Sequence, residues 1–234
     1  MPLSILTDYE VAALLLSLKV STVAVLCSLP LGILCAWVLA RLEFPGKSVL
    51  DSLIHLPLVL PPVVIGYLLL VSMGRSGFLG GWLYDTFGFS FSFSWRGVAL
   101  AAAVVSFPLM VRAIRQALEG VDVRLEQAAR TLGAGRLKVF FTISLPLTAP
   151  GIVSGMVLAF ARSLGEFGST ITFVSNIPGE TRTIPLAMYS FIETPGAEAQ
   201  AARLCVIAIL ISLASLIASQ WLSKRAQQRT LGQC

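Results

Sequence analysis

Long apolar stretches separated by short polar segments are the dominant pattern of this 234-residue chain. Crossing a hydrocarbon layer of about 30 Å as a helix takes roughly 20 residues. Five stretches are long enough, namely residues 10–39, 48–73, 96–118, 141–165 and 201–223. They are continuously apolar, whereas the strands of a membrane barrel alternate between apolar and polar positions. The pattern predicts an all-α polytopic membrane protein in which residues 1–234 form a single transmembrane domain.

Composition agrees with residence in a membrane. Hydrophobic residues make up 56% of the chain and charged residues 12%, so a water-soluble fold would have too little polar surface to cover its core. The first ten residues contain Asp8 and Glu10 but no basic residue, which argues against a cleavable leader. Membrane lipid is therefore an expected partner.

Lysine and arginine are distributed unevenly over the segments that connect the apolar stretches. Four lie on one side, namely Arg75, Arg96, Arg182 and Arg203. Eleven lie on the other side, namely Arg41, Lys47, Arg112, Arg115, Arg124, Arg130, Arg136, Lys138, Lys224, Arg225 and Arg229. Segments rich in Lys and Arg stay in the cytoplasm. We expect the N-terminus outside and the C-terminus in the cytoplasm.

The most basic connecting segment, residues 119–140, contains a short amphipathic pattern. Asp122 is a suitable N-cap, and Gly133 or Gly135 can take the left-handed conformation that ends a helix. One face of the helix between them is apolar and rich in alanine, formed by Leu125, Ala128, Ala129 and Leu132.

A helix of about three turns is marginal alone in water, so its apolar face needs a partner surface. A groove on a cytoplasmic protein would provide that surface. The alternative is a helix that lies on the inner leaflet of the membrane. Glu126 and the modest width of the apolar face argue against deep insertion into lipid.

The pattern Gln127-Ala-Ala-x-x-x-Gly133-Ala, followed by Leu145-Pro146, resembles the EAA motif of ABC importer permeases. The resemblance implies a coupling helix, between the third and fourth spans, that docks into a groove of an ATPase subunit. The implied coupling residues are Glu126, Gln127, Ala128, Ala129, Leu132, Gly133 and Ala134. Gln127 stands where the motif has Glu, and Glu126 lies one residue earlier, which is about 100° away around a helix.

Two further segments, residues 163–168 (SLGEFG) and 176–189 (NIPGETRTIPLAMY), resemble the permeases of molybdate ABC importers and, more loosely, those of sulfate importers. The resemblance implies the type I ABC importer permease fold with about five transmembrane helices. It also implies a homodimer in a bacterial cytoplasmic (inner) membrane, two cytoplasmic ABC ATPase subunits and an external oxyanion-binding protein. The expected activity is ATP-driven import of molybdate, with tungstate as a possible second substrate.

Two other functions stay open at this point. A sulfate or thiosulfate importer permease shares the Gly-Glu-Phe-Gly type of segment. A stand-alone secondary transporter would need its own ion-coupling carboxylates and internal repeats, and the chain has neither in recognisable form.

The outer side of the fourth span holds a charged pair. Arg162 and Glu166 are four residues apart on a helix, so they form either a structural ion pair or, together with the hydroxyl groups of Ser163, Ser169 and Thr170, a gate on the translocation path. The following outer loop, residues 168–200, has an apolar part at 184–192 that predicts a short re-entrant or surface helix. This apolar part either receives the binding protein or packs as an ordinary loop.

The sequence lacks recognisable catalytic, cofactor or metal sites. Lys47-Ser48 is not part of a nucleotide-binding P-loop, because Arg41 stands where that motif requires Gly. His55 is the only histidine and has no cluster of ligands near it in the sequence, and the four cysteines form no CxxC pair. Hydrolysis of ATP is therefore assigned to a partner subunit. Membrane orientation explains the net charge of +5, so we expect no nucleic acid partner.

Overall fold

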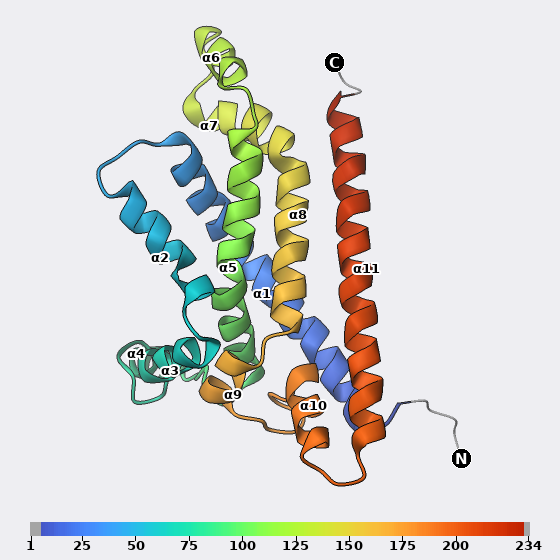
Figure 1. Cartoon of the computed structure of the whole chain (residues 1–234). Helices are drawn as coiled ribbons and strands as arrows, with labels where there is room; N and C mark the ends of the chain where they lie inside the picture. Colours follow the sequence, from blue (N-terminus) through green and yellow to red (C-terminus); the bar gives the residue numbers. More distant parts are fainter. Residues whose placement is uncertain (1–5, 232–234) are drawn as a thin grey trace.

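The structure is a computed structural model that describes residues 6–231, and over these residues it contains helices and connections but no strand. The expected all-α class is confirmed. The longest helices extend between the two ends of the molecule (Figure 1), namely α1 (Asp8–Arg41), α5 (Trp95–Glu119), α8 (Leu145–Leu164) and α11 (Glu198–Leu231). Each of these helices is long and apolar enough to cross a membrane. For α8, this span includes the helical turns before it, from Arg136.

Helix α5 lies at the centre and packs against α1 and α8. Glycine permits the close approach of α8, because a Cβ atom at Gly151 would overlap with the Cβ atom of Ala117. The buried cluster between the three helices consists of Val25, Ala36, Leu39, Met110, Val111, Ile114, Leu118 and Ala159.

The second expected span, residues 48–73, is not one straight helix. Its two halves, α2 (Lys47–Val59) and α3 (Pro62–Met73), meet at an angle of 112°. Pro61 and Pro62 cause the break, because neither has an N–H to donate and proline disfavours a helical conformation in the residue before it. Leu60 is accordingly extended, with φ −69° and ψ 140°. A kink was expected from the prolines, but this bend is too large for a single straight crossing.

The fourth expected span begins at Arg136 rather than at residue 141. Helix α7 (Arg136–Val139) continues through a π-helical turn, η1 (Phe140–Ser144), into α8. Pro146 has no N–H for the carbonyl group four residues before it, and the wider π turn lies directly before this proline. The segment between the spans is therefore joined to α8 by continuous helix.

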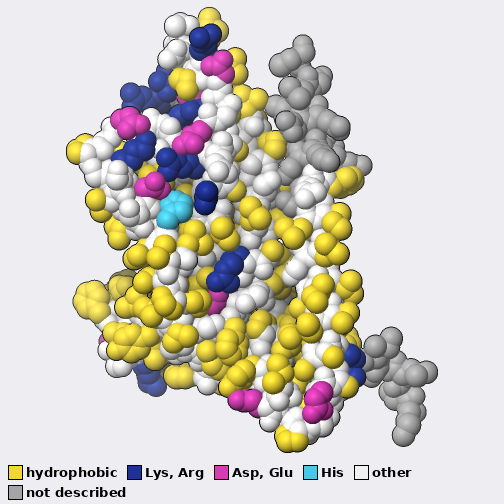
Figure 2. All heavy atoms as spheres, viewed as in Figure 1, with side chains coloured by type: hydrophobic (Ala, Val, Ile, Leu, Met, Phe, Trp, Pro, Cys, Tyr) yellow, Lys and Arg dark blue, Asp and Glu magenta, His cyan; other side chains and the backbone are white. Residues whose placement is uncertain are grey.

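Shorter helices cover both ends of the molecule. One end carries α6 (Val123–Thr131) and α7, and the other carries α3, α4 (Phe78–Phe87), α9 (Gly168–Val174), α10 (Ile184–Ile192) and the start of α1 (Figure 1). We name them the α6 end and the α9 end. The helix expected over residues 184–192 is confirmed as α10, whereas α4 was not predicted. Figure 2 shows charged side chains gathered at the α6 end and a mainly hydrophobic middle.

Candidate functional site

Helix α6 is capped at both ends by the residues that the sequence indicates. The side chain of Asp122 accepts a hydrogen bond from the backbone N–H of Arg124 at 2.9 Å, which satisfies a donor at the helix start. Gly133 has a φ of 85°, in the left-handed region that ends a helix. These caps define a helix of 9 residues that stands out at the α6 end (Figure 1).

The apolar face of α6 is open to solvent. Leu125 is 50% exposed and Leu132 is 88% exposed. The other predicted coupling residues on the surface are Gln127, Ala128 and Gly133, which are exposed, and Ala129 and Ala134, which are half-buried. An open leucine on a short amphipathic helix is a candidate contact for another molecule.

Glu126 differs from these residues, because its side chain points into the protein and is only 5% exposed. Its Oε1 atom accepts a hydrogen bond from Nε of Arg41 at 3.0 Å and from Oγ of Ser144 at 2.9 Å, and Nη2 of Arg41 lies 2.9 Å from the same oxygen. Nη2 of Arg41 also donates to the carbonyl group of Val121 at 3.1 Å. One carboxylate thus joins α6 to the last turn of α1 and to the π turn that leads into α8.

A buried ion pair of this kind holds its elements together strongly once formed. Removing one partner leaves an uncompensated charge and typically costs about 3–5 kcal/mol. While these bonds hold, Glu126 positions the helix and offers no surface to a partner. Gln127, at the motif's Glu position, is exposed instead, which agrees with the rotation expected from the one-residue shift.

Arg41 and Ser144 are site residues that the sequence did not identify. Arg41 is 85 residues from Glu126, and no local spacing connects them. The only sequence signal is that Arg41 is a basic residue at the end of an apolar stretch, which by itself indicates membrane orientation. Ser144 lies directly before Leu145-Pro146, and its hydroxyl group gave no signal in the sequence.

A second polar site lies where α8 ends and α9 begins. Nη1 of Arg162 lies 2.9 Å from Oε2 of Glu166, whose side chain is 2% exposed. Oε1 of Glu166 accepts hydrogen bonds from the backbone N–H and the hydroxyl group of Ser169 at 2.9 and 2.7 Å. The ion pair expected from the four-residue spacing is therefore present, and Glu166 also caps the start of α9.

The two remaining predicted gate residues behave differently. The hydroxyl group of Ser163 donates to the carbonyl group of Phe160 at 2.9 Å, within its own helix. Oγ1 of Thr170 is buried and has no hydrogen-bond partner. A buried hydroxyl group without a partner is energetically costly, so buried polar groups are normally hydrogen-bonded. An unpaired one such as Thr170 is therefore a candidate for a functional role.

Helix α9 is held against the broken second span. A Cβ atom at Gly66 of α3 would lie 2.5 Å from the carbonyl oxygen of Ser169, and one at Gly168 would lie 2.9 Å from Cβ of Pro62. The Arg162–Glu166 pair is thus next to the break between α2 and α3. Among residues 6–231, no group of three His, Cys, Asp or Glu side chains is placed to hold a metal ion.

Comparison with known proteins agrees with this arrangement. Residues 28–229 match the family described as binding-protein-dependent transport system inner membrane component. The molybdenum transport system permease protein ModB of Escherichia coli K12 is 72% identical over 225 residues, which cover 96% of this chain and 98% of that protein. The sulfate transport system permease protein CysT of the same organism is 36% identical over 222 residues, which cover 95% of this chain and 79% of that protein.

A solved structure supports the fold. One chain of a bacterial alginate ABC transporter, crystallised with its alginate-bound periplasmic protein, superposes with a TM-score of 0.75. The match covers 96% of this chain and 81% of that chain at 17% identity, so the likeness concerns the fold alone. The expected fold of the type I ABC importer permeases is confirmed.

Proposed function

The chain belongs to the family of binding-protein-dependent transport system inner membrane components, and we propose that it is the membrane-spanning subunit of an ATP-driven importer of molybdate. The assignment of molybdate as the substrate rests on the near full-length similarity to a molybdenum transport permease. Tungstate, a tetrahedral oxyanion of the same charge, is the expected second substrate. The weaker likeness to a sulfate permease makes sulfate or thiosulfate the alternative.

The proposed assembly contains two copies of this subunit, two ABC ATPase subunits and an external oxyanion-binding protein. The α6 end faces the cytoplasm, because the connecting segments at this end carry most of the Lys and Arg residues. The ATPase subunits bind there and hydrolyse ATP. The α9 end faces outward, where α10 and its flanking loops receive the binding protein.

The coupling mechanism follows from the way α6 is held. Each α6 helix docks its apolar face into a groove of one ATPase subunit. Closure of the two ATPase subunits on ATP draws the two α6 helices together. Since Glu126 bonds α6 to both Arg41 of α1 and Ser144 before α8, movement of α6 moves these two long helices with it. The path then opens outward to receive the anion, and hydrolysis of ATP restores the first state.

Arg162, Ser163, Glu166, Ser169 and Thr170 form the outer gate in this proposal. Arg162 is half-exposed and lies near the outer end of α8, although a cation at this depth is expensive unless it is paired or faces water. Its partner Glu166 is fixed by Ser169, so one guanidinium edge is held and the other stays available to a passing oxyanion. Hydroxyl groups beside it offer further hydrogen bonds.

Reconstituted transport tests the substrate. Proteoliposomes that contain this subunit, its ATPase and a loaded binding protein should take up radiolabelled molybdate only when ATP is supplied, and excess tungstate should compete. Preferential uptake of sulfate would favour the sulfate permease. Uptake in the absence of the ATPase would favour a secondary transporter.

Leu132→Glu tests the docking face. A charge placed in an apolar groove should weaken co-purification of the ATPase by about tenfold or more, because burial of an unpaired carboxylate costs more than the ~1.4 kcal/mol that corresponds to a factor of ten. Thr131→Glu introduces the same charge on the polar face of the same helix and should leave co-purification unchanged. Equal loss in both variants, or loss in neither, would contradict docking through this face.

Arg162→Gln tests the gate. Uptake of molybdate should fall by about tenfold, the effect of losing one charged hydrogen bond, while the ATPase still co-purifies. Because Glu166 loses its partner, thermal stability should fall too, and the double variant Arg162→Gln/Glu166→Gln should recover stability but not uptake. Normal uptake by the double variant would show that the pair is only structural.

A further inference from the structure

A polar cavity of about 300 Å³ lies between α2 and α5 near the α6 end. Its lining consists of Asp51, His55, Arg112, Arg115, Gln116 and Glu119. All six residues belong to α2 or α5, and none of them belongs to the coupling helix α6 or to the outer gate. The cavity is therefore separate from the two sites described above.

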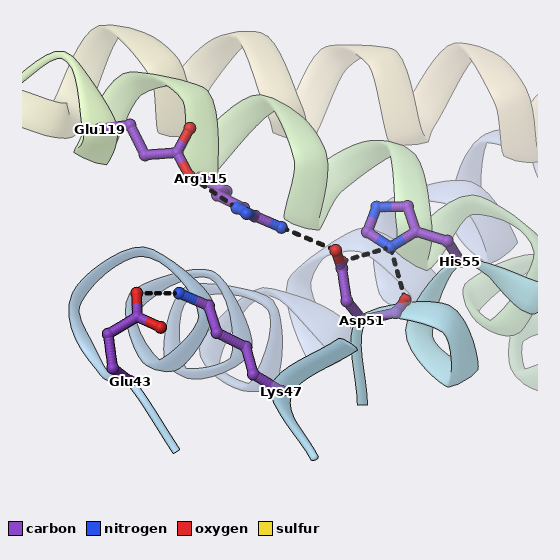
Figure 3. A network of polar contacts seen from close by, with 6 residues as sticks. All are labelled: Glu43, Lys47, Asp51, His55, Arg115 and Glu119. Atoms are coloured by element: carbon purple, nitrogen blue, oxygen red, sulfur yellow. Dashed lines mark hydrogen bonds and ion pairs between the residues drawn. The ribbon is translucent and has the colours of Figure 1, made fainter. Parts of the chain in front are cut away.

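Most of the charges in this cavity are fixed by one another, as Figure 3 shows. Nη1 of Arg115 lies 3.0 Å from Oδ2 of Asp51, and Nε of Arg115 donates to Oε1 of Glu119 at 2.7 Å. Nδ1 of His55 lies 2.9 Å from the carbonyl oxygen of Asp51 and 3.1 Å from Oδ1 of the same residue. Since both neighbours are acceptors, Nδ1 carries the hydrogen.

Arg112 is the exception, because its side chain is exposed and makes no hydrogen bond or ion pair with another described residue. It lies seven residues before the end of α5, which is roughly 10 Å along the helix axis. A guanidinium at this depth faces either water or a binding partner, since exposure to lipid is too costly. Its five N–H donors therefore have no partner among the described residues.

We propose that this cavity is a transient oxyanion site on the cytoplasmic half of the path, in which Arg112 and the amide of Gln116 bind the anion before its release. The inference rests on the proposed function and adds a site to it. A tetrahedral oxyanion that keeps part of its hydration shell fits the volume, and a planar guanidinium binds two oxygens of such an anion at once.

The balance of charge makes this site weak. The two arginines of the lining face two carboxylates, so the formal charge sums to zero while His55 is neutral. Asp51 and Glu119 are turned to Arg115, which leaves the donors of Arg112 available but keeps negative charge nearby. Weak binding suits a path, because an anion that is held tightly would leave slowly.

Arg112→Gln and Glu119→Gln should have opposite effects on the affinity for molybdate. In equilibrium dialysis of the permease–ATPase complex with radiolabelled molybdate, without the binding protein, Arg112→Gln should weaken binding by about tenfold, the effect of losing one charged hydrogen bond. Glu119→Gln removes a repelling charge and should strengthen it by a similar factor. Arg112→Lys should retain part of the affinity. Lys47→Gln breaks the ion pair of Lys47 with Glu43, which precedes α2, and removes a charge that does not line the cavity. This variant is the control and should leave the affinity for molybdate unchanged.

These binding experiments test the anion site independently of the proposed substrate. Equal binding by all variants, or loss of binding in both Arg112→Gln and Glu119→Gln, would overturn the proposal. If Arg112→Gln fails to assemble, Glu119→Gln still decides, because only an anion site predicts a gain. A complex that transports sulfate would fail the uptake test for molybdate, yet with labelled sulfate the two variants would still differ in opposite directions.

Discussion

Burial of the Glu126 carboxylate is the interaction on which the rest of this structure depends. A charge that is almost fully removed from water persists only when cationic and hydrogen-bonding partners surround it. Arg41 and Ser144 provide these partners from two different long helices. The short helix α6 would be only marginally stable alone, and the contacts of Glu126 attach it firmly to the long helices. Its apolar face is thereby free to bind a partner while its opposite side stays anchored.

The same requirement explains the irregular parts of the fold. Polar groups at membrane depth must be satisfied by protein or water, so breaks and charges gather where a path can supply water. The proline break between α2 and α3 lies against α9, close to Glu166 and Arg162. Toward the α6 end, α2 and α5 hold a second group of charges around Arg115 (Figure 3). In the proposed function, these two groups of charges lie along the route of the anion.

Local features of the site could be predicted from the sequence because they depend on neighbours along the chain. The Asp122 cap, the left-handed Gly133, helix α10 and the Arg162–Glu166 pair all follow from spacings of a few residues. The partners of Glu126 could not be predicted, since Arg41 lies 85 residues away and only the packed fold brings them together. The prolines at 61 and 62 indicate where the second span bends, but the sequence does not indicate that the bend measures 112°.

In the proposed mechanism, α6 moves as one rigid body with the end of α1. Pulsed electron paramagnetic resonance can measure this in the assembled complex, with spin labels at the exposed positions Gln127 and Glu43. If α6 and the end of α1 move together, the distance between labels 127 and 43 within one copy stays constant when ATP binds, while the distance between the two 127 labels of the assembly shortens. An intrachain distance that changes as much as the distance between copies would contradict it.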